Sequence, residues 1–239
     1  MKNSKIKILV VDDSQVILKL LKEYFKTYDV EIVTSINGLD GIKKSMKLKP
    51  DIILLDLLMP NFDGMKMLQV IKLMDELRDV PVIVISGNTD KTNVLTAIES
   101  GAEQVLAKPL KKNVLINAVE NSLGYSLPRG LNSADDTLNY SDDELKTQLK
   151  KLFVDNYNSE KAELKEALSK KETDRLKRFA HNARSVGSSI DYPQLTKINT
   201  EIEQLLTKDT IDWQIVRIKF SQVFSIIKDL ENSLAVWEN

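Results

Sequence analysis

Short apolar runs alternate with longer amphipathic segments through the first half of the chain. The runs are rich in Val, Ile and Leu, which predicts strands that are buried on both faces. The runs span residues 6–11, 30–33, 52–56, 80–85 and 104–107, and the amphipathic segments span residues 16–25, 39–46, 65–77, 92–100 and 113–123. Five repeats of strand and helix predict a flavodoxin-like α/β fold, in which helices cover both faces of a five-stranded, parallel, doubly wound sheet.

The second half of the chain has a different pattern. Residues 125–140 are polar and show no apolar periodicity, so we expect a linker there. Residues 141–239 begin with a capping box, Ser141 and Glu144, and carry apolar positions at helical spacing with no strand pattern. Such segments pack as a helical bundle. The predicted organisation is a first domain over residues 1–124, the linker, and a bundle domain.

The composition narrows the classes of function. A net charge of −1 over 239 residues argues against a general affinity for nucleic acid or anionic membranes, and no basic recognition helix is visible. The absence of cysteine excludes a disulfide framework and fits a reducing compartment. Residues 1–7 are polar, and no apolar run approaches the roughly 20 residues that a membrane span needs. We therefore expect a cytoplasmic protein with no nucleic-acid partner and no membrane insertion.

Polar side chains stand at the ends of four predicted strands. Asp12 and Asp13 end the first strand, Asp56 the third, Ser86 the fourth and Lys108 the fifth. Each has a simpler explanation when it is taken alone: a turn or helix start for the acidic pair, a loop cap for Asp56 and a surface charge for Lys108. Because ligands bind at the carboxyl ends of strands in open α/β sheets, however, the combination favours one crevice that these residues share.

The predicted crevice has the chemistry of a phosphoryl site. Three close carboxylates raise each other's pKa unless a cation is present, and hard oxygen ligands suit Mg²⁺. The metal and Lys108 would offset charge on the phosphoryl oxygens, and the Ser86 hydroxyl would donate a hydrogen bond to one of them. Asp56 would then be the nucleophile and would form an aspartyl phosphate.

The first domain resembles the receiver domain of two-component response regulators. The resemblance is carried by the segments Ile8 to Ser14, Asp51 to Pro60, Asp63-Gly64, Pro81 to Ser86, and Gly101-Ala102 with Lys108-Pro109. It implies that Mg²⁺ is bound by Asp12, Asp13, Asp56 and the backbone carbonyl of Leu58. It also implies that Asp56 accepts a phosphoryl group from the phosphohistidine of a sensor histidine kinase.

The same resemblance implies roles for the other residues of the crevice. Ser86 and Lys108 would contact the phosphoryl oxygens, and the peptide bond between Lys108 and Pro109 is expected to be cis. The receiver would catalyse its own phosphorylation and dephosphorylation. One position departs from the family, which usually has an aromatic residue where this chain has Val105. The aromatic switch that reports phosphorylation in relatives is therefore in doubt, whereas the chemistry at Asp56 is not.

His181 is the only histidine of the chain. A lone helical histidine is more often a surface residue than a reactive one. Its position predicts that it lies at or beyond the edge of the apolar stripe of its helix. Lys177, Arg178, Arg184 and Ser185 then lie three or four residues away on the helix surface. Cations and small side chains in that place would suit a phosphoryl group on the imidazole.

The surrounding sequence, Ala180-His181-x-x-Arg184-Ser185-x-Gly187-Ser188, resembles the histidine phosphotransfer domain. The usual pattern of that domain is Ala-His-x-x-Lys-Gly followed by small residues. Arg184 replaces the lysine, keeping the charge with a bulkier fork, and Ser185 replaces the glycine. The resemblance implies phosphotransfer at His181. The implied surroundings of the phosphohistidine are Lys177, Arg178, Arg184, Ser185 and Ser188.

These features together predict a phosphorelay protein, a relay intermediate rather than a turnover enzyme. Asp56 would take a phosphoryl group from a kinase, and His181 would exchange one with Asp56 or with the aspartate of a second receiver. One alternative is a response regulator whose bundle is not phosphorylated and serves dimerisation or partner binding. Another, a Mg²⁺-dependent phosphohydrolase, is weakly supported because the position two residues after Asp56, Leu58, is not a carboxylate.

Overall fold

The computed structural model describes residues 5–59, 64–87, 91–130 and 142–235. The chain divides into two compact units, which we call unit 1 (Met1–Asn139) and unit 2 (Tyr140–Asn239). None of the helices in the described ranges is both long and apolar enough to cross a membrane.

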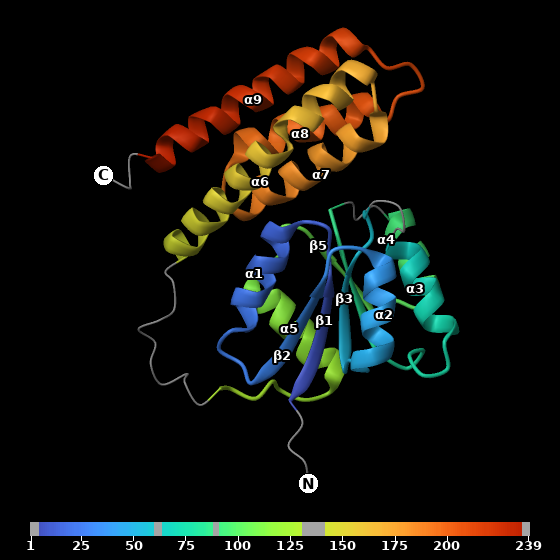
Figure 1. The fold of residues 1–239 in the computed structure, drawn as a ribbon. Helices are drawn as coiled ribbons and strands as arrows, with labels where there is room; N and C mark the ends of the chain where they lie inside the picture. The colour runs from blue at the N-terminus through green and yellow to red at the C-terminus, as the bar shows by residue number, and fades with distance from the viewer. Residues whose placement is uncertain (1–4, 60–63, 88–90, 131–141, 236–239) are drawn as a thin grey trace. The chain divides into compact units, whose positions relative to one another are not determined.

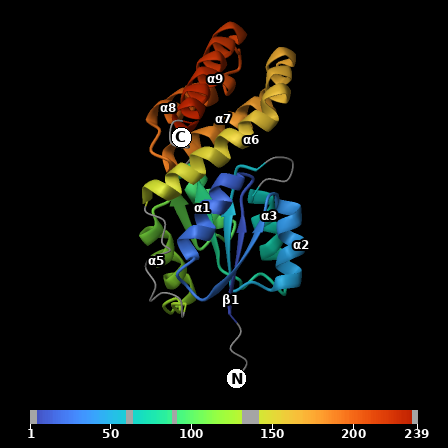
Figure 2. The ribbon, with the colours of Figure 1, turned by 60° about the vertical axis from the view of Figure 1, so that its left-hand side comes forward.

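Unit 1 contains a five-stranded parallel sheet, which confirms the predicted architecture. Its strands are β1 (Ile6–Val11), β2 (Val30–Ser35), β3 (Ile52–Asp56), β4 (Val82–Ser86) and β5 (Gln104–Ala107), in the spatial order β2-β1-β3-β4-β5. Its helices are α1 (Gln15–Phe25), α2 (Gly38–Leu48), α3 (Gly64–Leu73), α4 (Lys91–Glu99) and α5 (Lys112–Leu123). Helices α1 and α5 cover one face of the sheet, and α2, α3 and α4 cover the other (Figures 1 and 2).

The two faces of the sheet build two separate cores. Alternate residues of a strand point to opposite faces, so Ile8 and Val10 of β1 pack with α1 and α5, whereas Leu9 and Val11 pack with α3. All four side chains are fully buried. This burial on both faces explains why the strand sequence is a continuous apolar run rather than an alternating one.

The segment just after α5 differs from its prediction. The sequence places residues 125–130 in a linker, but they pack against unit 1. Leu127 is only 5% exposed and belongs to the core beneath α1 and α5. The backbone carbonyl of Pro128 accepts a hydrogen bond from the Asp29 amide at 2.7 Å. The rest of the expected linker, residues 131–140, lies outside the described residues.

Unit 2 is helical throughout its described residues. Its helices are α6 (Asp142–Lys170), α7 (Thr173–Ser189), α8 (Pro193–Leu206) and α9 (Trp213–Ala235). Each helix packs against the next along the chain, and α9 also packs against α6. Ion pairs join Lys146 to Asp191 and Arg175 to Glu163, so the start of α6 lies beside the end of α7 and the two helices run antiparallel.

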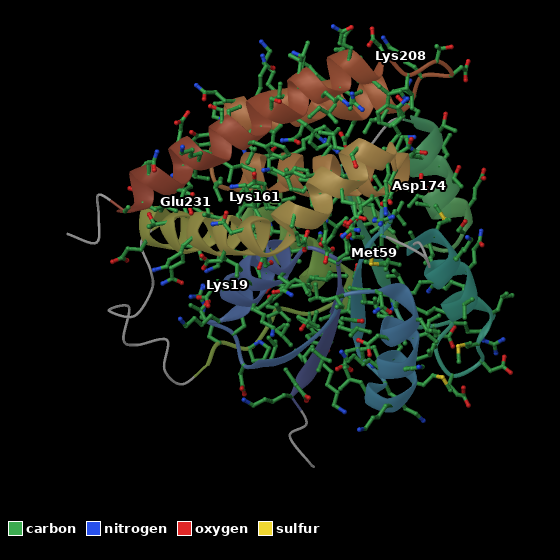
Figure 3. All side chains as sticks on the ribbon, turned by 45° about the horizontal axis from the view of Figure 1, so that its top comes forward. Lys19, Met59, Lys161, Asp174, Lys208 and Glu231 are labelled. Atoms are coloured by element: carbon green, nitrogen blue, oxygen red, sulfur yellow. The ribbon has the colours of Figure 1, made fainter. Side chains whose placement is uncertain are left out.

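The centre of unit 2 contains a cluster of four aromatic rings. Tyr157 of α6, Phe179 of α7, and Phe220 and Phe224 of α9 lie with neighbouring ring centroids 6.0 to 6.2 Å apart. At such distances tilted rings attract each other beyond the effect of buried area. The Nζ of Lys161, a residue labelled in Figure 3, lies 5.5 Å from the Tyr157 ring centroid.

Helices α7 and α8 approach each other closely at Gly187. A Cβ atom at this position would lie 2.9 Å from both the backbone nitrogen and the side-chain oxygen of Thr196. A larger residue would push the two helices apart. The lone histidine of the chain lies on α7 less than two turns before this glycine.

Candidate functional site

The carboxyl edge of the sheet brings together the residues that were predicted to share a crevice. In the strand pairing, Asp56 of β3 lies opposite Ile85 of β4, and Ser86 lies opposite Ala107 of β5. Asp12, Asp13 and Asp56 each place a carboxylate oxygen within 4.8 Å of the others. Asp12, Asp56 and Ser86 are buried, and Asp13 is half-buried.

Lys108 joins the two buried carboxylates. Its Nζ donates to Asp56 Oδ2 at 2.7 Å and to Asp12 Oδ2 at 2.9 Å, and its side chain is 5% exposed. The peptide bond that follows it, to Pro109, is cis as expected. Burial lowers the pKa of Lys108, but the charges of Asp12 and Asp56 outweigh this effect and leave its pKa above the ordinary value.

The other oxygen of each buried carboxylate accepts a backbone hydrogen bond. Asp12 Oδ1 accepts from the Ser14 amide at 2.8 Å, and Asp56 Oδ1 accepts from the Leu58 amide at 3.1 Å. These bonds fix both side chains in one orientation. Burial nevertheless raises the pKa of Asp12 to about 7, with the charge of Asp56 adding to it and the charge of Lys108 opposing it.

This set of donors fits a magnesium ion. Three carboxylates converge on a point with a single ammonium beside them, so the cluster holds an excess of negative charge. Burial is the main cause of the raised pKa of Asp12, and the negative charges of Asp56 and Asp13 add to it. A divalent ion with oxygen ligands would remove the excess of charge, and Asp12, Asp13 and Asp56 are the residues in place to hold one.

A glycine shapes the loop after β3. A Cβ atom on Gly64 would lie 1.9 Å from the Asp56 carbonyl oxygen, so no other residue fits there. The Gly64 amide donates to the Leu57 carbonyl at 3.0 Å, which returns the chain toward the site. The predicted metal ligand Leu58 lies inside this loop and is 47% exposed. Pro60 and Asp63, which contributed to the resemblance, lie outside the described residues.

Val105 occupies the position where an aromatic residue was expected from the family pattern. It pairs with Val84 and packs, partly buried, against the core beneath α3. Its side chain is too short to move between an inward and an outward position as a ring does. Ser86 lies further along β4, opposite Ala107, and its backbone carbonyl accepts a hydrogen bond from the Lys108 amide at 2.9 Å.

A second polar cluster lies in unit 2 around His181. The sequence predicts a position at or beyond the edge of the apolar stripe, but the residue is only 6% exposed. Its Nδ1 lies 2.9 Å from Glu203 Oε1 of α8, and Arg184 Nη2 lies 3.3 Å from the same nitrogen. Burial is tolerated because these groups give the ring polar partners. Its Nε2 is buried and has no hydrogen-bond partner among the described residues.

The other residues predicted around His181 have varied surroundings. Ser185 is buried, and Lys177 and Arg178 are half-buried on α7. Ser188 turns to α8, where its hydroxyl lies 3.3 Å from that of Thr196. The sequence analysis missed Glu203 altogether. The one signal for Glu203 in the sequence was its position next to Ile202 and near Leu206, two apolar residues that are buried in the structure.

A parallel sheet with three carboxylates and a lysine at its carboxyl edge is the arrangement of a signal receiver domain. Comparison with known proteins agrees, since residues 8–120 match the response regulator receiver domain family. Chemotaxis protein CheY of Listeria monocytogenes is 34% identical over 118 residues, which cover 49% of this chain and 98% of CheY. The chain belongs to the response regulator receiver family, and unit 1 is its receiver domain of two-component signalling.

Two further similarities concern the same half of the chain. Protein-glutamate methylesterase/protein-glutamine glutaminase 2 of Methanosarcina mazei is 44% identical over 109 residues, which cover 44% of this chain and 29% of that protein. The structure of chemotaxis protein CheY4 of Vibrio cholerae is 22% identical, covers 50% of this chain and 100% of CheY4, and has a TM-score of 0.49. The match to the receiver family ends at residue 120, so unit 2 lies beyond it.

Proposed function

We propose that this protein is a phosphorelay component in which Asp56 and His181 both carry a phosphoryl group. Residues 1–124 would form the receiver, and residues 141–239 a four-helix bundle that acts as a histidine phosphotransfer domain. The observation that carries the proposal is the pairing of two sites in one chain. One is an acidic edge with a lysine-bonded aspartate, and the other is a lone imidazole whose Nδ1 is held by a carboxylate.

The receiver reaction would begin with a phosphohistidine on a sensor histidine kinase. An oxygen of Asp56 forms a bond to phosphorus as the bond from phosphorus to the kinase imidazole breaks, and the electron pair returns to that nitrogen. Lys108 stays beside the new acyl phosphate and compensates its charge, and the Ser86 hydroxyl donates to a phosphoryl oxygen. Magnesium, held by Asp12, Asp13, Asp56 and the Leu58 carbonyl, would supply the remaining positive charge.

His181 would exchange the phosphoryl group with a receiver aspartate, either Asp56 or that of a second response regulator. Its Nδ1 faces a carboxylate, which can only accept a hydrogen bond, so the ring proton stays on Nδ1. The lone pair is therefore on Nε2, the nitrogen that would attack phosphorus. Lys177 and Arg178 lie one turn before His181 and would attract the phosphoryl group. We place the reaction in the cytoplasm, where a sensor kinase presents its phosphohistidine.

A second function is favoured by particular observations. His181 is buried, and Ile215 and Ile218 of α9 are 41% and 52% exposed. A response regulator whose helices bind a partner or a second copy would need such an apolar surface and no reactive imidazole. Replacement of His181 by Ala separates the two functions, because it leaves a binding output intact and abolishes a relay.

The lability of the bound phosphate tests the proposal. The full chain is labelled by a phosphorylated kinase or receiver with Mg²⁺ and then treated with alkali or acid. An acyl phosphate on Asp56 is lost in alkali, whereas a phosphohistidine survives alkali and is lost in acid. We expect both kinds of label, with the alkali-stable fraction missing in His181→Gln. An alkali-stable label that persists in His181→Gln would refute the assignment.

A further inference from the structure

A carboxylate of α8, that of Glu203, contacts two residues of α7, and the function proposed above uses only its contact with His181. Glu203 divides its two oxygens between two partners. Oε1 lies 2.9 Å from His181 Nδ1, and Oε2 lies 2.7 Å from Arg184 Nε. The side chains are poorly accessible, with His181 7%, Arg184 19% and Glu203 23% exposed. We propose that the Arg184–Glu203 pair positions His181 for phosphoryl exchange, an inference that rests on the function proposed above.

The hydrogen-bonding capacities of the three groups decide their roles. A guanidinium only donates hydrogen bonds, and a carboxylate only accepts them. Arg184 therefore cannot accept the Nδ1 proton of His181, although its Nη2 lies 3.3 Å away. Glu203 can accept that proton through Oε1, which lies 2.9 Å from Nδ1. Arg184 acts on the imidazole through Glu203, because the ion pair between its guanidinium and Oε2 restrains the direction in which Oε1 points.

The arrangement also matches the charge that the reaction creates. As Nε2 forms its bond to phosphorus, the bond from phosphorus to the aspartate oxygen breaks and its electron pair stays on the carboxylate. The imidazole keeps its Nδ1 proton and becomes positively charged. Glu203 compensates that charge at 2.9 Å. In the reverse direction the electron pair returns to Nε2, and the same bond holds the ring in place.

The pair further explains why arginine stands where the related domains have lysine. A lysine ammonium is a single point charge at the end of a flexible chain, whereas the arginine fork keeps a fixed geometry toward a carboxylate. At this position, three residues after His181, the fork contacts both the ring and Glu203. Arg184 is thus a positioning residue, and replacement by lysine should not restore its effect.

The test uses the full chain as both donor and acceptor. His181→Gln is phosphorylated at Asp56 with acetyl phosphate and Mg²⁺, freed from the donor, and mixed with acceptor chains that carry Asp56→Asn. Transfer is followed as alkali-stable label. We expect Glu203→Gln in the acceptor to slow transfer about 10- to 100-fold, the range seen when the partner of a functional histidine is removed. We expect Arg184→Lys to slow it about tenfold.

A matched control and a double variant separate positioning from a general loss of structure. Glu201→Gln removes another α8 carboxylate, which pairs with Lys219 of α9 at 2.6 Å, and should leave transfer unchanged. In the Glu203→Gln background, Arg184→Lys should cause no further loss, because its effect passes through Glu203. Circular dichroism verifies the fold of each variant, and Arg184→Lys keeps the test decisive if Glu203→Gln does not fold.

The possible outcomes separate the positioning role of Arg184 and Glu203 from the phosphotransfer at His181 on which it rests. If the Asp56→Asn acceptor takes up no alkali-stable label, phosphotransfer from Asp56 to His181 is wrong and the inference falls with it. If that acceptor is labelled, and acceptors that also carry Glu203→Gln or Arg184→Lys are labelled at the same rate, phosphotransfer stands and the positioning pair is refuted. Additive losses in the double variant would also refute the pair, since Arg184 would then act on its own.

Discussion

The two polar clusters of this protein are built in opposite ways. The receiver site collects its charges from the ends of separate strands, and three carboxylates there outnumber one lysine. The His181 site takes its groups from two adjacent helices, and one Glu203 carboxylate balances one Arg184 guanidinium. The first arrangement has an excess of negative charge that a divalent cation would relieve. The second lacks that excess among the described residues, since Glu203 is paired with Arg184, and Lys177 and Arg178 lie one turn before His181.

Of the changes that would alter this contrast between the two sites, replacement of the phosphoacceptor Asp56 has the largest expected effect. Asp56→Asn keeps the shape of the side chain but removes the nucleophilic oxygen charge, so labelling by acetyl phosphate at unit 1 should be lost entirely. Asp51→Asn is the matched control, because Asp51 immediately precedes the same strand, is exposed, and accepts a hydrogen bond from the Lys7 amide at 2.7 Å. Alkali-labile phosphate is measured in both. Full labelling of Asp56→Asn would show that another residue accepts the phosphoryl group.

Replacement of Lys108 removes the positive charge that the receiver cluster already has. Lys108→Met leaves Asp12 and Asp56 buried without their shared cation, so we expect labelling at Asp56 to fall about 100-fold or more. Unfolding in urea without Mg²⁺ should also require about 3 kcal/mol less free energy. Lys112→Met, an exposed change at the start of α5, is the control. Equal labelling of the two variants would exclude a role of Lys108 in the site.

Magnesium itself should stabilise unit 1 and leave unit 2 unchanged. An ion that binds only the folded state at 100 times its dissociation constant adds about 2.7 kcal/mol to the free energy of unfolding. Asp13→Asn should reduce this gain, since it removes one of the three carboxylates. Thermal unfolding with and without Mg²⁺ measures the effect. A gain that is the same in Asp13→Asn would place the ion elsewhere.

The smallest expected effect concerns the packing beneath the His181 site. Gly187→Ala introduces a Cβ atom 2.9 Å from Thr196, so α7 and α8 must separate, and we expect a loss of about 2 kcal/mol in the stability of unit 2. Gly130→Ala is the control, because its Cβ would meet nothing closer than 3.9 Å. Urea unfolding compares them. If Gly187→Ala left the free energy of unfolding of unit 2 unchanged, α7 and α8 would be able to move apart at no cost.

The receiver site could be predicted from sequence because one rule of topology suffices. Parallel strands end at a common edge, so Asp12, Asp56 and Lys108 had to meet there, whatever the details of packing. The period of apolar residues also fixed which segments become strands and helices. The five-stranded sheet followed from these local patterns, whereas the receiver domain was expected from the resemblance of its strand-end segments to that family.

The contacts that could not be predicted depend on how elements rotate against each other. Glu203 reaches His181 across the α7–α8 contact, which is close at Gly187, and helical spacing leaves the rotation of each helix open by tens of degrees. Leu127 is buried although it lies in a polar segment, and the next residue, Pro128, accepts a hydrogen bond from the distant Asp29 amide. Neither contact leaves a periodic signal in the chain.

Transfer between two single variants tests the central claim most directly. His181→Gln carries label only on Asp56, and Asp56→Asn can accept it only on His181. After the labelled first chain is mixed with the second, we predict that alkali-labile phosphate falls while alkali-stable, acid-labile phosphate rises on the acceptor by the same amount. If the label leaves Asp56 only as inorganic phosphate and none reaches the second chain, His181 is not a phosphotransfer residue for this receiver.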